Sequence, residues 1–90
     1  MSDAGAQVRA EMQAWLAEQV DDPSVLDSLS DGTDLLAEGV IDSFTMLELL
    51  SWFEERFGVF VDFADATEPL TQVGPLVGRV AELMVASDLA

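Results

Sequence analysis

The chain has 90 residues, and 18 acidic side chains against three arginines give it a formal net charge of −15. Because it contains no Cys, His or Lys, it has no disulfide, no thiolate metal site, no imidazole base and no phosphate-loop lysine. The acidity disfavours nucleic acid and anionic membranes as partners and favours proteins with basic patches. The length predicts a single domain over residues 1–90, ordered over about 4–86.

Neither the apolar stretches nor the N-terminal residues of the chain indicate a membrane protein. No apolar stretch reaches the roughly 20 residues that a spanning helix needs. The N-terminal residues Met-Ser-Asp-Ala-Gly lack the basic start and apolar run of a secretory signal. We therefore expect no membrane span, a cytoplasmic location and a monomer.

The first predicted element is an amphipathic helix over residues 4–20, because an apolar residue recurs at every fourth position: Val8, Met12, Leu16 and Val20. Pro23 disfavours helix just before it and ends the segment. Residues 21–41 form a long connector that is rich in Asp, Ser and Gly but also carries seven large apolar residues. We expect this connector to be pinned across the core, with a short helical turn near residues 24–29.

The segment 44–57 reads FTMLELLSWFEERF and is the most regular part of the chain. Eight of its 14 residues are apolar, which exceeds a one-sided stripe, so the pattern predicts a nearly central helix with a charged edge. Gly58 follows at once and suits the left-handed position after a helix end.

The remaining segments predict an extended connector at 59–61, a short helix at 64–68 and a last helix from 72 or 75 to 86. Thr71 is a candidate cap for that helix if it starts early. Together these elements predict an all-α fold, a small four-helix bundle of three longer helices and one short one, with a long connector between helices 1 and 2.

Asp42-Ser43 stands at the boundary between the long connector and the helix over 44–57. One interpretation is helix capping, because Asp and Ser oxygens accept hydrogen bonds from the first free N–H groups of a helix. The same position also suits an attached phosphodiester, since unpaired N–H groups and the positive end of the helix dipole stabilise a phosphate there.

Residues 35–62 resemble the acyl and peptidyl carrier proteins, of the free-standing type. The residues that carry the resemblance follow the family's spacing: Asp42-Ser43-Phe44, then Glu48-Leu49, Glu54-Glu55 and Phe57-Gly58-Val59. Phe44 stands where the family usually has Leu, and the segment after Gly58 departs from the family's common Ile-Pro-Asp ending.

The resemblance implies that Ser43, with Asp42 in its motif, receives 4′-phosphopantetheine from coenzyme A through a phosphopantetheinyl transferase. The thiol of that arm would carry an acyl or aminoacyl group as a thioester, and the chain would not itself be an enzyme. The implied partners are this transferase, an acyl- or aminoacyl-activating ligase, and a downstream synthase or acyltransferase with a basic docking patch.

The family's docking surface implies a set of partner-binding residues along and after the helix over 44–57: Phe44, Met46, Glu48, Glu54, Glu55 and Asp62. Any such acidic cluster is also compatible with a solvated face. Ordinary core packing is the simpler interpretation of Met46, and Trp52 is compatible with either core or surface.

The use of Arg without Lys, together with many Ala, indicates a GC-rich bacterial gene. Among carriers, this favours a discrete fatty-acyl or acyl carrier of specialised metabolism, such as lipopeptide or polyketide biosynthesis. An aminoacyl carrier loaded by an amino-acid-activating ligase is the alternative.

A competing motif lies at residues 27–38, DSLSDGTDLLAE, which partly fits a twelve-residue calcium loop. Leu29 and Leu35 occupy two ligand positions, so we expect no dedicated metal site and only weak divalent binding by crowded carboxylates. An alternative to the carrier function, from another functional class, is an acidic helical interaction module or a weak calcium-binding module without a prosthetic group.

Overall fold

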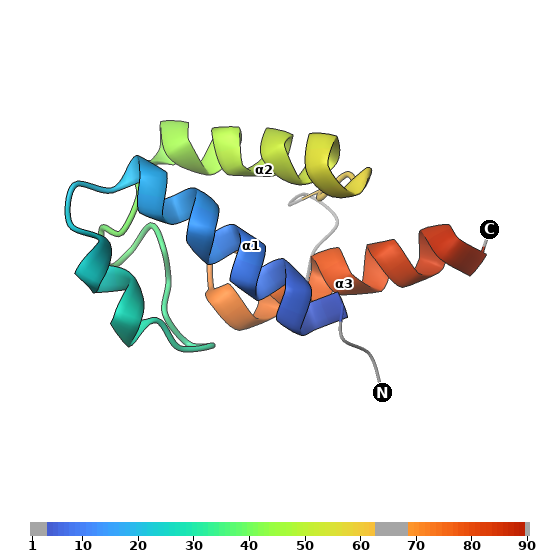
Figure 1. Ribbon diagram of the computed structural model, residues 1–90, viewed down its shortest axis with the longest axis horizontal. Helices are drawn as coiled ribbons and strands as arrows, with labels where there is room; N and C mark the ends of the chain where they lie inside the picture. Colours follow the sequence, from blue (N-terminus) through green and yellow to red (C-terminus); the bar gives the residue numbers. More distant parts are fainter. Residues whose placement is uncertain (1–3, 63–68, 90) are drawn as a thin grey trace.

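The computed structural model describes residues 4–62 and 69–89, in which three α-helices and one short 3₁₀ helix follow one another (Figure 1). Their bounds are α1 Ala4–Gln19, η1 Pro23–Ser28, α2 Ser43–Phe57 and α3 Val73–Leu89. The described residues contain no β-strand, so the predicted all-α bundle with a long connector is confirmed. The short helix expected at 64–68 lies outside the described residues. No described helix is long and apolar enough to cross a bilayer.

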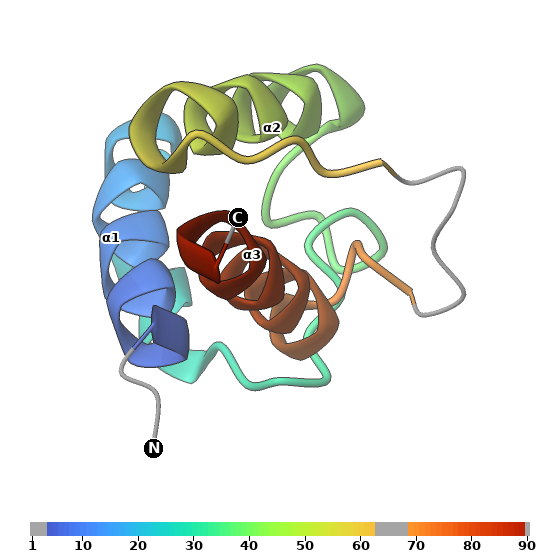
Figure 2. The same cartoon turned by 90° about the vertical axis from the view of Figure 1, so that its right-hand side faces the viewer.

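The most enclosed helix is α3. In Figure 2 it is seen nearly end-on, with α1, α2 and the long connector around it. The expectation that the helix over 44–57 is central is wrong, because α2 buries only the single row Met46, Leu49 and Phe53. Leu50, Trp52 and Phe57 are half-buried against the core. Phe44 and Leu47 face outward instead and are 70% and 64% exposed.

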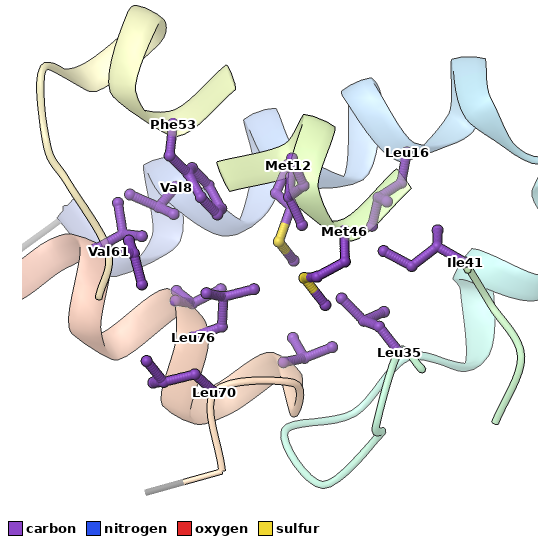
Figure 3. Packing of buried hydrophobic residues seen from close by; sticks show 14 of the residues in the cluster. Val8, Met12, Leu16, Leu35, Ile41, Met46, Phe53, Val61, Leu70 and Leu76 are labelled. Atoms are coloured by element: carbon purple, nitrogen blue, oxygen red, sulfur yellow. The ribbon is translucent and has the colours of Figure 1, made fainter. Parts of the chain in front are cut away.

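One apolar core joins the helices and the connectors (Figure 3). The four-residue spacing in α1 correctly predicts its buried row, Val8, Met12 and Leu16, whereas Val20 is half-buried. Unbranched methionines from α1 and α2 both point into this core (Figure 3). The buried apolar residues are Val8, Met12, Leu16, Leu26, Leu35, Ile41, Met46, Leu49, Phe53, Val59, Val61, Leu70, Val73, Leu76, Val77 and Val80.

The long connector is pinned across the core as expected, because its apolar residues Leu26, Leu35 and Ile41 are buried. Backbone hydrogen bonds then fasten it to the start of α3. The N–H of Leu35 donates to the carbonyl of Thr71 (2.8 Å), and the N–H of Val73 donates to the carbonyl of Thr33 (2.9 Å).

The first backbone N–H groups of α3 donate to carbonyls of this connector rather than to a capping side chain. Gly74 N–H donates to the carbonyl of Asp31 over 2.9 Å, so two of the first N–H groups of the helix have backbone partners. The Thr71 hydroxyl donates to Asp34 (2.8 Å) instead of capping the helix. The helix begins at Val73 and continues to Leu89, three residues beyond the predicted end.

Two ion pairs hold α1 to its neighbours. Arg9 pairs with Asp31 of the connector, and Arg56 of α2 pairs with Glu11 of α1. Gly58 ends α2 in the left-handed conformation, with φ of 70°, which glycine adopts without a Cβ clash.

The close approach of Asp31 to α3 predicts opposite effects for two glycines of the same helix. A Cβ at Gly74 would lie 2.8 Å from the Cβ and 3.1 Å from the carbonyl oxygen of Asp31, whereas a Cβ at Gly78 would meet no atom within 4 Å. We expect Gly74→Ala to lower the free energy of unfolding by about 1–3 kcal/mol. Gly78→Ala should raise it by up to about 1 kcal/mol, because alanine is the better helix former. Urea denaturation of both variants tests this, and equal effects would contradict the described contact.

Candidate functional site

Ser43 is the first residue of α2, and its side chain is exposed. The residue before it, Asp42, is the N-cap: its backbone is extended, and its carboxylate accepts a hydrogen bond from the backbone N–H of Thr45 over 2.8 Å. The predicted cap at this boundary is therefore present. It is provided by Asp42, so the hydroxyl of Ser43 is not needed for capping.

The first turn of α2 can still accept an anion. Asp42 occupies the N–H of Thr45, and its carbonyl accepts from the N–H of Met46 (2.9 Å). The N–H groups of Ser43 and Phe44 precede any intrahelical acceptor. The carboxylate of Asp42 also draws on the N–H of Phe44. A phosphodiester on Ser43 would thus lie beside the N–H of Ser43 and the positive end of the helix dipole.

The hydrogen bond from Thr45 also affects the charge of the cap. The backbone N–H of Thr45 stabilises the carboxylate and lowers the pKa of Asp42 below its ordinary value of 3.8. Asp42 is therefore ionised at neutral pH, which strengthens the cap because a negative charge at a helix N-terminus is favourable.

A surface groove of about 390 Å³ begins beside Ser43 and follows α2. We call it the α1–α2 groove. On α2 its residues recur every three or four positions, which places them along one face of the helix, and α1 contributes a single side chain. The residues that line it are Trp15, Phe44, Leu47, Glu48, Ser51, Trp52 and Glu55.

Two tryptophans, Trp15 of α1 and Trp52 of α2, are among the residues that line the groove. The rings of Trp15 and Trp52 stack with centroids 5.8 Å apart and planes inclined by 26°. Trp52 also meets Phe57 edge-on at 5.6 Å. Trp52 is therefore half-buried and combines both interpretations that the sequence left open, since one part of it packs on the core and another lines the groove.

The structure brings only part of the expected partner-binding set together. Phe44, Glu48 and Glu55 line the α1–α2 groove. Glu54 is exposed but does not line it, and Asp62 lies at a separate hollow with Phe60, Arg79 and Leu83. These side chains keep the surface positions that partner contact requires.

Met46 is the exception, because only 4% of it is exposed and it packs in the core. Its place among the partner-binding residues is corrected, and the simpler packing interpretation holds. Leu47 and Ser51 were missed, although their spacing from Phe44 on one helix face could have identified them. Trp15 could not be found this way, since it comes from another helix.

Two carboxylates of the calcium-like segment, those of Asp31 and Asp34, are engaged within the fold. Asp31 pairs with Arg9. Asp34 accepts from the N–H groups of Leu36 (3.0 Å) and Ala37 (2.9 Å). The bond from Ala37, followed by that from the Thr71 hydroxyl, lowers the pKa of Asp34. Over residues 4–62 and 69–89, no three acidic side chains gather as metal ligands would.

Comparison with known proteins gave no match: no protein-family model fits the chain, and no curated protein and no solved structure is significantly similar to it.

Removing the Asp42 cap should destabilise the chain in a pH-dependent manner. Its folded-state pKa lies below 3.8, so its contribution is complete above the unfolded-state value and is lost as the pH falls through the folded-state value. We expect Asp42→Ala to lower the melting temperature by a few degrees at pH 7, and the difference from the wild type to shrink as the pH is lowered toward 2.

The control is Asp27→Ala, which removes the same charge from an exposed residue of η1. Differential scanning fluorimetry at low protein concentration is suitable, because the isoelectric point is about 4.1. An Asp42→Ala effect that persists unchanged at pH 2, or that equals the control at pH 7, would contradict the cap.

Proposed function

We propose that the chain is a carrier protein in which Ser43 bears a 4′-phosphopantetheine arm that holds an acyl or aminoacyl group as a thioester. The observation that carries the proposal is the position of the Ser43 hydroxyl: it is exposed at the first residue of α2, and a separate residue caps the helix. An incoming transferase can therefore reach the oxygen without breaking the fold.

The residues around Ser43 fit the group that would be attached. The N–H of Ser43 and the positive end of the α2 dipole would stabilise the phosphodiester oxygens. The arm would supply the thiol, which agrees with a chain that contains no cysteine. The protein's own part is to present the arm and to be recognised by the enzymes that load and unload it.

The composition supports the finer assignment to specialised metabolism. Arginine without lysine and abundant alanine favour a discrete acyl carrier of a lipopeptide or polyketide pathway, with an aminoacyl carrier of nonribosomal peptide synthesis as the alternative. The implied partners are the transferase, an activating ligase and a synthase or acyltransferase.

A second candidate function is supported by the exposed apolar side chains of the α1–α2 groove. An acidic helical module that binds a protein partner without a prosthetic group would use the same groove and would leave Ser43 unmodified.

Intact mass spectrometry separates the two functions. After incubation with coenzyme A, Mg²⁺ and a promiscuous phosphopantetheinyl transferase, we expect the mass to rise by one phosphopantetheine. The increase should disappear in Ser43→Ala and remain in Ser51→Ala, which removes an exposed hydroxyl of the same helix. An unmodified wild-type chain that is folded by circular dichroism would reject the carrier function in favour of the second candidate.

The loading rate should depend on the charge of the groove. Glu48 lines the groove and Glu54 does not, so we expect Glu48→Lys to slow loading several-fold at low salt and Glu54→Lys to slow it less. The difference should shrink at high salt as the charges are screened. Equal rates for wild type and Glu48→Lys at low ionic strength would exclude this face from the encounter.

A further inference from the structure

The chain contains a single Asp-Gly pair, Asp31-Gly32, in the long connector. Because glycine has no side chain, its backbone nitrogen is the least hindered nucleophile that can follow an aspartate. The chain has no asparagine, so the related reaction of an Asn-Gly pair does not compete. Asp31 is therefore the residue at which attack of the backbone on a side-chain carboxyl group would concentrate.

The pair lies at the tip of a turn. The N–H of Thr33 donates to the carbonyl of Ser30 over 3.1 Å, which makes Asp31 and Gly32 the two central residues of a β-turn. The side chain of Asp31 is 77% exposed, so water reaches its carboxyl group. The fold does not require glycine at position 32, because its φ is not positive and a Cβ there would meet no atom within 4 Å.

Three contacts restrain Asp31 despite this exposure, and we call them the Asp31 contacts. Its carbonyl oxygen accepts from the N–H of Gly74 over 2.9 Å, and its carboxylate pairs with Arg9 of α1. Its Cβ also packs so closely on α3 that a Cβ at Gly74 would lie 2.8 Å from it. Both the main chain and the side chain of Asp31 are thus held.

We propose that Asp31 is a site of spontaneous isomerisation to isoaspartate and that the Asp31 contacts control its rate. The backbone nitrogen of Gly32 attacks the side-chain carboxyl carbon of Asp31. A C–N bond forms, and the carboxyl OH leaves as water with the amide hydrogen, which gives a cyclic imide. The proposal does not depend on the function proposed for Ser43.

Water then opens the imide by breaking one of its two C–N bonds. Opening at the side-chain carbonyl returns aspartate. Opening at the main-chain carbonyl gives isoaspartate, in which the main chain passes through the former side chain of Asp31. Water is the only molecule that leaves and enters, so the reaction needs no oxidant, reductant or enzyme.

The Asp31 contacts oppose the first step. Ring closure requires the carboxyl carbon of Asp31 to reach the nitrogen of Gly32, so the side chain and the following peptide unit must both rotate. The ion pair with Arg9 and the hydrogen bond from Gly74 resist these rotations. The reaction therefore proceeds from molecules in which the connector has locally separated from α3, and its rate follows the population of that open state.

Isoaspartate cannot restore the native contacts. The carbonyl of Asp31 that accepted from Gly74 becomes part of a free carboxylate, and the main chain is longer by one methylene. This displaces the next acceptor, the carbonyl of Thr33, from the N–H of Val73 (2.9 Å in the native chain). Isomerisation would thus remove both backbone partners from the start of α3, and those N–H groups would be left to water.

The site is tested by keeping the full chain at neutral pH and physiological temperature for several weeks. Methylation by an isoaspartyl methyltransferase measures isoaspartate, and electron-transfer fragmentation of the tryptic peptide 10–56 locates it. We expect isoaspartate at residue 31 to exceed that at Asp27, an exposed aspartate that is followed by Ser28. Gly32→Ala should lower the amount at residue 31 several-fold.

Variants test the control by the Asp31 contacts. Gly74→Ala forces the connector away from α3, so we expect it to raise the rate about fivefold or more. Gly78→Ala on the same helix touches nothing and should not raise it. Arg9→Gln should also raise the rate, and Arg56→Gln, which breaks the other ion pair, should raise it less.

Three results would overturn the proposal. Isoaspartate that is no more abundant at residue 31 than at Asp27 would reject the site. Equal rates in the native chain and in the chain unfolded by urea would reject the control by the Asp31 contacts, and this comparison requires no variant to fold. Unchanged hydrogen-exchange protection of Val73 and Gly74 in the purified isoaspartate form would reject the loss of their backbone partners.

Discussion

The contact between the long connector and the start of α3 determines where Ser43 stands. Backbone bonds tie residues 31–35 to residues 71–74, and the N–H of Ile41 donates back to the carbonyl of Leu35 over 3.1 Å. Because Leu35 and Ile41 are buried, the position at which the chain leaves the core after Ile41 is fixed. The next two residues therefore reach the surface as an N-cap and the exposed first residue of α2.

The sequence was most informative where a local rule decides the structure. The spacing of Val8, Met12 and Leu16 identifies the inner face of α1, and Asp42 is a cap because of its own side chain and position. It was least informative where distant segments meet. The start of α3 depends on carbonyls of Thr33 and Asp31 some 40 residues away. The helix propensities of the residues around position 73 do not indicate these distant contacts.

The candidate site shows the same division. Ser43 and its helix boundary follow from the local pattern, and the acidic residues of α2 are visible as a cluster. The pattern does not say which apolar side chains of α2 face outward, because its apolar residues surround most of the helix. Only the shared core of α1, the long connector and α3 selects Met46 for burial and leaves Phe44 and Leu47 outside. Likewise, no property of α2 alone indicates that Trp15 will stack on Trp52.

The two methionines that α1 and α2 place in the core have a chemical consequence. Met12 and Met46 are almost fully buried among aliphatic and aromatic side chains. Peroxide would convert a thioether that becomes accessible during a transient opening into a sulfoxide, which places a polar group among apolar side chains. Oxidation of Met12 or Met46 would thus weaken the packing of α2 on the core without any chemical change at the exposed Ser43.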